Sequence, residues 1–269
     1  MAQNWMIHVV AEVAGCDAEV YLNDVPIERL RQHESAALSL PVHPQIVAGP
    51  NELKLVVNPG PTPAQALHPG SGAPVGAAAQ ARARLLVVPL GAEPAPEAKS
   101  LLEVRFEAAG RPPAPGPLVQ VASGSLPLGF GKRVWEHAPP LAALSPELVA
   151  SALGFVAQVR DLLQRGEAQR LAPLLRPKIA DAAASYGLDP EQELAAFVQE
   201  WTAMARTPGW LLAPVTAETA SLRLCAGGRF VQCVAKDWQP LIRSADMSEG
   251  GVLFGMGIAR RGEQWVIVA

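Results

Sequence analysis

The spacing of apolar residues changes near residue 135, and the change predicts two modules in one chain. Before it, short apolar and β-branched runs are separated by Gly, Pro and Asn, a pattern typical of antiparallel strands. After it, apolar residues first recur every three or four positions, as in helices, and then return to a period of two. The pattern therefore predicts an α+β chain, with a strand-rich domain over residues 1–134 and a helical plus antiparallel-sheet domain over residues 135–269.

Several segments of the first half have the composition of strands: Trp5–Val13, Glu19–Leu22, Ala36–Leu40, Glu52–Val57, Ala81–Leu90 and Leu101–Phe106. Asn23-Asp24 predicts a tight hairpin turn, because Asn and Asp tolerate a positive φ. Short strands at this spacing predict an antiparallel β-sandwich of the jelly-roll type. The long segments Pro59–Gly76 and Gly110–Pro117 are expected to be loops, either surface excursions of the sandwich or sites of partner contact.

Capping residues and stop signals predict the helices of the second half. The expected helices run from the cap Ser145 to Gly166, from Pro177 to just before Gly187, and from the cap Asp189 to about Arg206. A short helical turn is expected before Pro177, because Pro173 and Pro177 interrupt that segment.

Two hairpins are expected after the helices. Strands Ser221–Ala226 and Arg229–Ala235 flank Gly227-Gly228, a two-residue turn of type I′ or II′. The resulting register places Leu222 opposite Cys233, and it places Cys225 and Cys233 on opposite faces, where they cannot form a disulfide. A second hairpin is expected from Val252–Ala259 and Gln264–Val268. Three helices followed by a curved antiparallel sheet resemble the NTF2-like cone in outline, from element order alone.

Composition and charge restrict the function. The 49% hydrophobic content is ample for two cores, and the net charge of −3 argues against a nucleic-acid binder, whose surface is usually basic. The three cysteines form no C-x-x-C pair, Met1–Val13 lacks the features of a signal peptide, and no apolar run reaches the length of a membrane span. These observations predict a cytoplasmic protein with reduced thiols and no membrane segment.

The chemistry-bearing residue types show no complete catalytic or metal motif. The histidines His8, His33, His43, His68 and His137 include no H-x-H or H-E-x-x-H pattern, although His33 and His43 could meet across a hairpin. Isolated structural histidines are therefore expected, with no metal and no cofactor.

The nucleophile and phosphate motifs are also incomplete. Ser123-Gly124-Ser125 lacks the G-x-S-x-G elbow, and Cys225 is expected to be structural, with pairing to a histidine as the alternative. Gly129-Phe130-Gly131-Lys132-Arg133 lacks the rest of a phosphate loop, so it is expected to be a domain connection with two exposed cations. The sequence thus favours a protein that is not an enzyme.

A connecting segment near the carboxyl end combines an aromatic residue, an arginine and acids. Tryptophan and arginine are enriched among binding hot spots, and loops commonly carry recognition. The candidate partner-binding residues are Asp237, Trp238, Arg243, Asp246 and Glu249. Three alternatives stay open at this stage: a solvated loop, an acid/base site, and a structural role in which Trp238 and Ile242 close the sheet.

The first half has a limited resemblance to galactose-binding-like jelly rolls. It is carried by the segments Val20–Ile27 and Val47–Val57, the second with a G-x-N-x-L pattern. The resemblance implies a sandwich that could bind sugar. Few aromatic residues other than Trp5 and Tyr21 are available for a sugar platform, however.

The second half resembles a different group of proteins, and the match covers roughly residues 80–269. The segments are Leu174-Leu175-Arg176-Pro177-Lys178-Ile179 with Tyr186-Gly187, Leu224-Cys225-Ala226-Gly227-Gly228-Arg229, and Asp237-Trp238-Gln239-Pro240-Leu241. They look like segments of two-domain proteobacterial proteins, some of which resemble cytoplasmic immunity proteins of type VI secretion toxins. The resemblance implies a non-enzymatic inhibitor that binds and occludes a toxin encoded nearby, such as a nuclease. The alternative is an NTF2-like ligand-binding protein or enzyme with a pocket inside the cone. The oligomeric state is left open.

Overall fold

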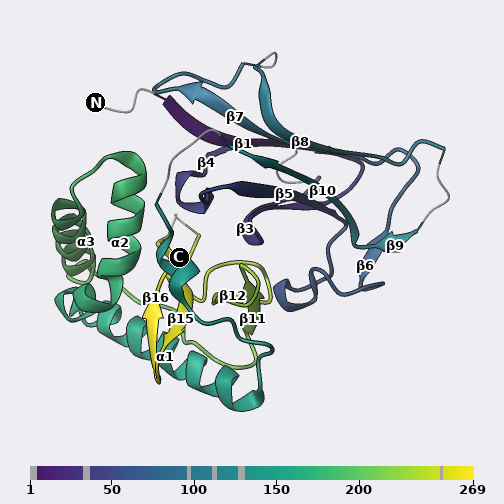
Figure 1. Cartoon of the computed structure of the whole chain (residues 1–269). Helices are drawn as coiled ribbons and strands as arrows, with labels where there is room; N and C mark the ends of the chain where they lie inside the picture. Colours follow the sequence, from purple (N-terminus) through teal and green to yellow (C-terminus); the bar gives the residue numbers. More distant parts are fainter. Residues whose placement is uncertain (1–4, 33–36, 96–97, 111–113, 127–130, 249–250) are drawn as a thin grey trace. The chain divides into compact units, whose positions relative to one another are not determined.

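The computed structural model describes residues 5–32, 37–95, 98–110, 114–126, 131–248 and 251–269 (Figure 1). The chain divides into two compact units, of which the first comprises residues 1–61 and 65–133 and the second residues 62–64 and 134–269. The fold is of the mixed α and β class; the described residues form three α-helices and several antiparallel sheets, with most of the strands in the amino-terminal part.

Two four-stranded antiparallel sheets build the first unit, with the strand orders β4-β1-β7-β8 and β10-β5-β2-β3. The strands are β1 Trp5–Ala14, β2 Ala18–Leu22, β3 Val25–Leu30, β4 Ala37–Pro41, β5 Pro50–Val57, β7 Gln80–Pro89, β8 Ser100–Glu107 and β10 Leu118–Ser125. The predicted strands are confirmed within one or two residues at each end, except that Ala36 lies outside the described residues. Strand β10 was not predicted, because Ala, Ser and Gly replace β-branched residues in its second half.

The inward-facing residues of both sheets share one hydrophobic core. Along β1, every second residue from Ile7 to Val13 is buried, and Leu53 and Leu55 of β5 belong to the same core. This alternation follows from the two-residue period of a strand. The turn between β2 and β3 is also confirmed, since Asn23 and Asp24 both have a positive φ, as a type I′ turn requires.

The two segments expected to be plain loops contain short strands that pair with each other, and one side chain, that of Asn58, holds the first of them. Segment β6 Gly72–Pro74 pairs with β9 Pro115–Gly116, and a 3-10 turn forms at Pro63–Gln65. The Asn58 side-chain oxygen accepts a hydrogen bond from the Asp17 amide at 3.0 Å, and its nitrogen donates to two carbonyls of β6 at 3.2 and 3.1 Å. The loop expectation was therefore wrong for these strands, because a polar side chain supplies the contacts that apolar periodicity does not reveal.

A second polar cluster lies buried in the first unit, around the 3-10 turn His43–Gln45. The Ile7 amide donates to Nε2 of His43 at 2.6 Å. The Arg133 guanidinium, itself buried, donates to the backbone carbonyl oxygens of His43 at 2.6 Å and Ile46 at 2.7 Å. These bonds satisfy polar groups that would otherwise be costly to bury.

Three α-helices begin the second unit after a 3-10 turn at Val134–His137. They are α1 Pro146–Gln164, α2 Ala172–Tyr186, preceded by a 3-10 turn at Ala168–Leu171, and α3 Pro190–Met204. The predicted caps are confirmed. Oγ of Ser145 accepts a hydrogen bond from the Leu148 amide, and the Asp189 carboxylate accepts hydrogen bonds from the amides of Glu191 and Gln192.

The predicted start of the second helix was wrong. Helix α2 begins at Ala172 and continues through Pro177, and it ends before Gly187, whose φ of 69° forms the expected left-handed cap. Pro173 lies in the first turn, where a backbone N–H has no helical partner, so it does not interrupt the helix. Pro177 lacks only one helical hydrogen bond, and burial of Leu175 in the core offsets this loss.

The sheet of the second unit is antiparallel, in the order β11-β12-β15-β16. Its strands are β11 Ala220–Cys225, β12 Phe230–Ala235, β15 Gly257–Arg261 and β16 Gln264–Ile267. The strand register of the first hairpin is confirmed, with Leu222 opposite Cys233. The two-residue turn is not: strand pairing ends at Cys225 opposite Phe230, and positive φ values extend over Ala226, Gly227 and Gly228. The first strand of the second hairpin is shorter than predicted, because its expected amino-terminal part forms β14 Leu253–Phe254, which pairs with β13 Ile242–Arg243.

The helices and this sheet share the core of the second unit. Val156 and Leu163 of α1, Leu175 of α2, and Val231 and Ile258 of the sheet are buried together. Helices α2 and α3 lie side by side (Figure 1). Across the described residues, no helix has both the length and the apolar character needed to cross a membrane.

Candidate functional site

The two-stranded antiparallel sheet of β13 and β14 is extended by a third extended segment, residues 211–213. The segment 211–213 runs beside β13, where Leu212 is bridged to Ser244, the Ala213 amide donates to the Arg243 carbonyl at 2.8 Å, and the Ala245 amide donates to the Leu211 carbonyl at 2.8 Å. On the other side of β13, Arg243 lies opposite Leu253 of β14. The three strands together give this part of the second unit a defined inner and outer face.

The two faces differ in polarity and burial. Leu212, Ile242 and Phe254 are at most 8% exposed and belong to the core. Side chains alternate along a strand, so the residues next to them point outward. The outer face, here called the β13–β14 surface, comprises Leu211, Arg243, Ala245 and Leu253, of which Leu211 is 57% and Leu253 46% exposed. Two large apolar side chains are therefore presented on one rigid face.

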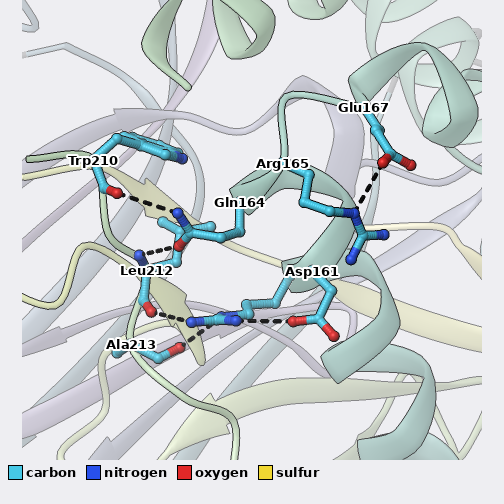
Figure 2. Close-up of polar contacts among 8 residues, drawn as sticks. Asp161, Gln164, Arg165, Glu167, Trp210, Leu212 and Ala213 are labelled. Carbon is cyan, nitrogen blue, oxygen red and sulfur yellow. Dashed lines mark hydrogen bonds and ion pairs between the residues drawn. The ribbon is translucent and has the colours of Figure 1, made fainter. Parts of the chain in front are cut away.

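Side chains of α1 fix the segment that carries Leu211 (Figure 2). The Gln164 side chain accepts from the Leu212 amide at 2.6 Å and donates to the Trp210 carbonyl at 3.1 Å. The Arg160 guanidinium donates to the carbonyl of Ala213 at 3.2 Å and to that of Leu212. Side chains of α1 thus form hydrogen bonds with the backbone groups on the edge of the segment that faces the helix. These bonds hold Leu211 on the outer face.

Two of the predicted site residues meet at the edge of this surface. Nη1 of Arg243 lies 3.1 and 2.8 Å from the two carboxylate oxygens of Asp237. The arginine side chain is 23% exposed and the aspartate 54%. Such a pair contributes little to stability in water, but it fixes the orientation of both groups beside the exposed leucines.

Trp238 occupies an unusual backbone position. Its amide closes a turn by donating to the Ala235 carbonyl at 3.0 Å, and its own φ is 73°. Glycine is usual at this position of a three-residue hairpin loop, and a bulky residue there is strained. The half-buried ring lies under the Arg223 guanidinium, 5.4 Å from its carbon to the ring centroid. The tryptophan therefore forms a cation–π contact that offsets part of this strain.

The remaining predicted site residues follow β13. Asp246 is exposed, and its carboxylate accepts from the Ser248 amide at 2.9 Å, a hydrogen bond that holds the pKa of Asp246 below its usual value. Glu249 lies outside the described residues. The structure thus joins Asp237 to Arg243, places Trp238 against Arg223, and leaves Asp246 in a separate turn.

The cysteines are buried free thiols. Burial raises the pKa of the Cys233 thiol well above its usual value, which leaves it protonated and unreactive. Cys225, on the opposite face of the hairpin, is 1% exposed. The face of this sheet that meets the helices carries Leu222, Val231 and Cys233, all packed in the core, whereas Arg223 alternates to the other face.

The remaining motifs do not converge on a reaction centre. No cluster of three or more potential metal-ligating side chains occurs in the described part of the chain. Nδ1 of His8 contacts Oγ of Ser39 at 3.0 Å, and His33 lies outside the described residues. Lys132 is exposed as expected, but the expectation of an exposed Arg133 was wrong, because its guanidinium is bound by buried carbonyls of the first unit.

The exposed leucines were missed by sequence reasoning. Leu211 follows Trp210 in a short apolar run, and Leu253 lies in an expected strand, so nothing in the local pattern shows that either side chain faces solvent. Their exposure depends on the pairing of three segments that are distant in sequence. Comparison with protein-family models, curated proteins and solved structures found no match to this chain.

Proposed function

We propose that this chain is a non-enzymatic protein-binding module that docks a cognate protein on the β13–β14 surface. The observation that carries the proposal is the exposure of Leu211 (57%) and Leu253 (46%) on one face, beside the ion pair of Arg243 and Asp237. Large apolar side chains that are exposed together and bordered by charged groups mark interaction sites.

The arrangement has the composition of a small interface. Interfaces combine an apolar centre with a polar rim, and arginine is enriched among the residues that dominate binding energy. The α1 side chains that hold segment 210–213 keep the surface preorganised, so little conformational entropy is lost when a partner binds.

The proposed partner is a bacterial toxin, which makes the chain an immunity protein. The resemblance of residues 80–269 to proteins related to type VI secretion immunity supports this class of partner. The exposed carboxylates of Asp237 and Asp246 and the net charge of −3 would favour a basic surface, such as that of a nuclease, and would speed association. Such complexes form in the cytoplasm, where the three buried thiols would stay reduced.

The proposal extends to the finer architecture. The shared core of the two four-stranded sheets supports a jelly-roll-like sandwich for the first unit. Three helices packed on an antiparallel sheet support an NTF2-like arrangement for the second. On this proposal both units act as scaffolds, and recognition depends on the β13–β14 surface.

The test is co-expression of the chain with the product of the adjacent gene, followed by size-exclusion chromatography with light scattering. A 1:1 complex is expected, together with loss of the partner's toxicity. The variant Leu211→Arg should weaken that complex by about tenfold or more, because a charge replaces an apolar contact at the centre of the interface.

Leu188→Arg is the matched control, since Leu188 is also exposed (49%) but lies in the connection between α2 and α3. It should leave the complex unchanged. Absence of any complex, or equal affinity of the wild-type chain and the Leu211→Arg variant, would contradict the proposal.

A further inference from the structure

A groove in the second unit lies between α2, α3 and residues 252–255. The groove has a volume of about 400 Å³, a size suited to a small organic molecule. Phe197, Trp201 and Phe254 line it, and their ring centroids lie 5.5 to 5.9 Å from one another. Trp201 and Phe254 are only 5% and 8% exposed, so the half-buried Phe197 presents most of the aromatic surface of this wall.

A single amine lies against this wall. Nζ of Lys178 lies 5.4 Å from the centroid of the Phe254 ring and donates to the Gly255 carbonyl at 3.0 Å. The lysine side chain is half-buried. Within the described part of the chain, no carboxylate forms an ion pair with this group. An ammonium group has three donors, so two remain for another acceptor.

We infer that this groove binds a small apolar carboxylic acid, with its ring or alkyl body against Phe197, Trp201 and Phe254 and its carboxylate on Nζ of Lys178. Charge complementarity selects the anion: a carboxylate would supply the counter-charge that the amine lacks in a partly desolvated position. The wall selects an apolar body, because burial of that body against the half-buried Phe197 ring removes its own apolar surface from water.

Among the described residues that line the groove, the other titratable group is Glu200 of α3. Glu200 is exposed, so water screens its repulsion of a bound anion. The attraction between that anion and the half-buried Lys178 amine is screened less. No titratable side chain is contributed by residues 252–255. Lys178 is thus the group that fixes the position of the carboxylate.

The electrostatics of Lys178 add a pH dependence. Burial lowers the pKa of Lys178 to about 8, so the free groove holds a mixture of ammonium and neutral amine near that pH. A bound carboxylate favours the ammonium form and raises this pKa. Affinity for the acid should therefore be highest below pH 8 and should fall as the pH rises above it.

The test is isothermal titration calorimetry of the full chain with 3-phenylpropionate and, separately, with its neutral amide, 3-phenylpropionamide. At pH 7 the acid should bind at least about tenfold more tightly than the amide, as expected for one charge-assisted hydrogen bond. At pH 9.5 the difference should become smaller. Lys178→Met preserves the apolar stem and should reduce the affinity for the acid to that for the amide.

Lys236→Met is the control, because Lys236 is exposed and lies outside the groove; it should bind the acid as the wild-type chain does. Thermal unfolding of both variants establishes that they are folded. Equal affinity for acid and amide, unchanged acid binding by Lys178→Met, or no binding of the acid at 10 mM, a concentration well above typical site affinities, would overturn the inference.

Discussion

The side-chain amide of Gln164 pairs with the backbone around Leu212 as a neighbouring strand would. Its oxygen accepts from the Leu212 amide at 2.6 Å, and its nitrogen donates to the carbonyl of Trp210 at 3.1 Å. A helix side chain therefore supplies hydrogen-bond partners for a backbone amide and a backbone carbonyl on one edge of this segment. The other edge of the segment pairs with β13. The position of Leu211 on the outer face depends on this pairing.

Replacement of Gln164 by Leu should destabilise the second unit by about 1–3 kcal/mol, because a backbone donor and a backbone acceptor lose their partners. Urea unfolding measures the change, and hydrogen exchange at the Leu212 amide should become faster. Gln199→Leu, at an exposed position of α3, is the control and should change stability by less than about 0.5 kcal/mol. Slow exchange of the Leu212 amide in the Gln164→Leu variant would show that the Gln164 hydrogen bonds are not needed to hold this segment.

The backbone of Trp238 predicts an order of stability between two variants. Both Trp238→Gly and Trp238→Ala remove the ring and its contact with Arg223, but only Gly adopts a φ of 73° without strain. The Gly variant should therefore be the more stable of the two by about 1 kcal/mol in thermal or urea unfolding. If the Ala variant is equally stable, the turn relaxes to another conformation when the ring is lost.

Glu103 on β8 predicts an acid-dependent contribution to the stability of the first unit. A hydrogen bond from Arg82, with help from Arg105 and Ser100, lowers the pKa of Glu103 to about 2, although partial burial opposes the shift. A carboxylate with a depressed folded-state pKa stabilises the fold above its unfolded value, near 4.5, and loses that contribution as the pH falls to about 2.

The wild-type chain and Glu103→Gln should therefore differ most above pH 4.5, by at most about 1 kcal/mol for a partly exposed pair, and the difference should vanish near pH 2. Urea unfolding across this range measures it. Glu107→Gln, at an exposed position of the same strand, is the control for the substitution itself. A difference that does not change with pH would mean that packing of the side chain matters more than its charge.

Asn58 allows side-chain and backbone effects to be separated. Its φ is 47°, and its side chain makes three hydrogen bonds, two to carbonyls of β6 and one to the Asp17 amide. Asn58→Gly keeps the backbone conformation and should cost about 1–3 kcal/mol from the lost hydrogen bonds. Asn58→Ala should cost about 1 kcal/mol more, because Ala is strained at positive φ. Equal stability of the two variants would show that the backbone rearranges.

Local sequence signals predicted most of the regular elements correctly. The caps Ser145 and Asp189 and the Asn23-Asp24 turn act within a few residues, so the interactions that form them can be inferred from the sequence. Helix α2 was misjudged at Pro177, where tertiary burial outweighed a local breaker. Strand β10 was missed because its partner β5 decides its conformation more than its own composition does.

The functional surface was harder to predict. Asp237 and Arg243 were identified from their residue types, and the structure brings them together. Leu211 and Leu253 were not, because exposure of an apolar side chain follows from strand pairing between distant segments, which no periodicity records. The aromatic groove was missed because Lys178 and Phe254 are distant in sequence and meet only in the folded second unit.

The three buried thiols make the chain a reporter of its own opening. Burial raises the pKa of Cys16 in the first unit to about 11, and Cys233 lies in the core of the second. An alkylating reagent reaches such a thiol only when the surrounding structure opens. Mass spectrometry of alkylated peptides would therefore time the opening of each unit separately, with no label added to the protein.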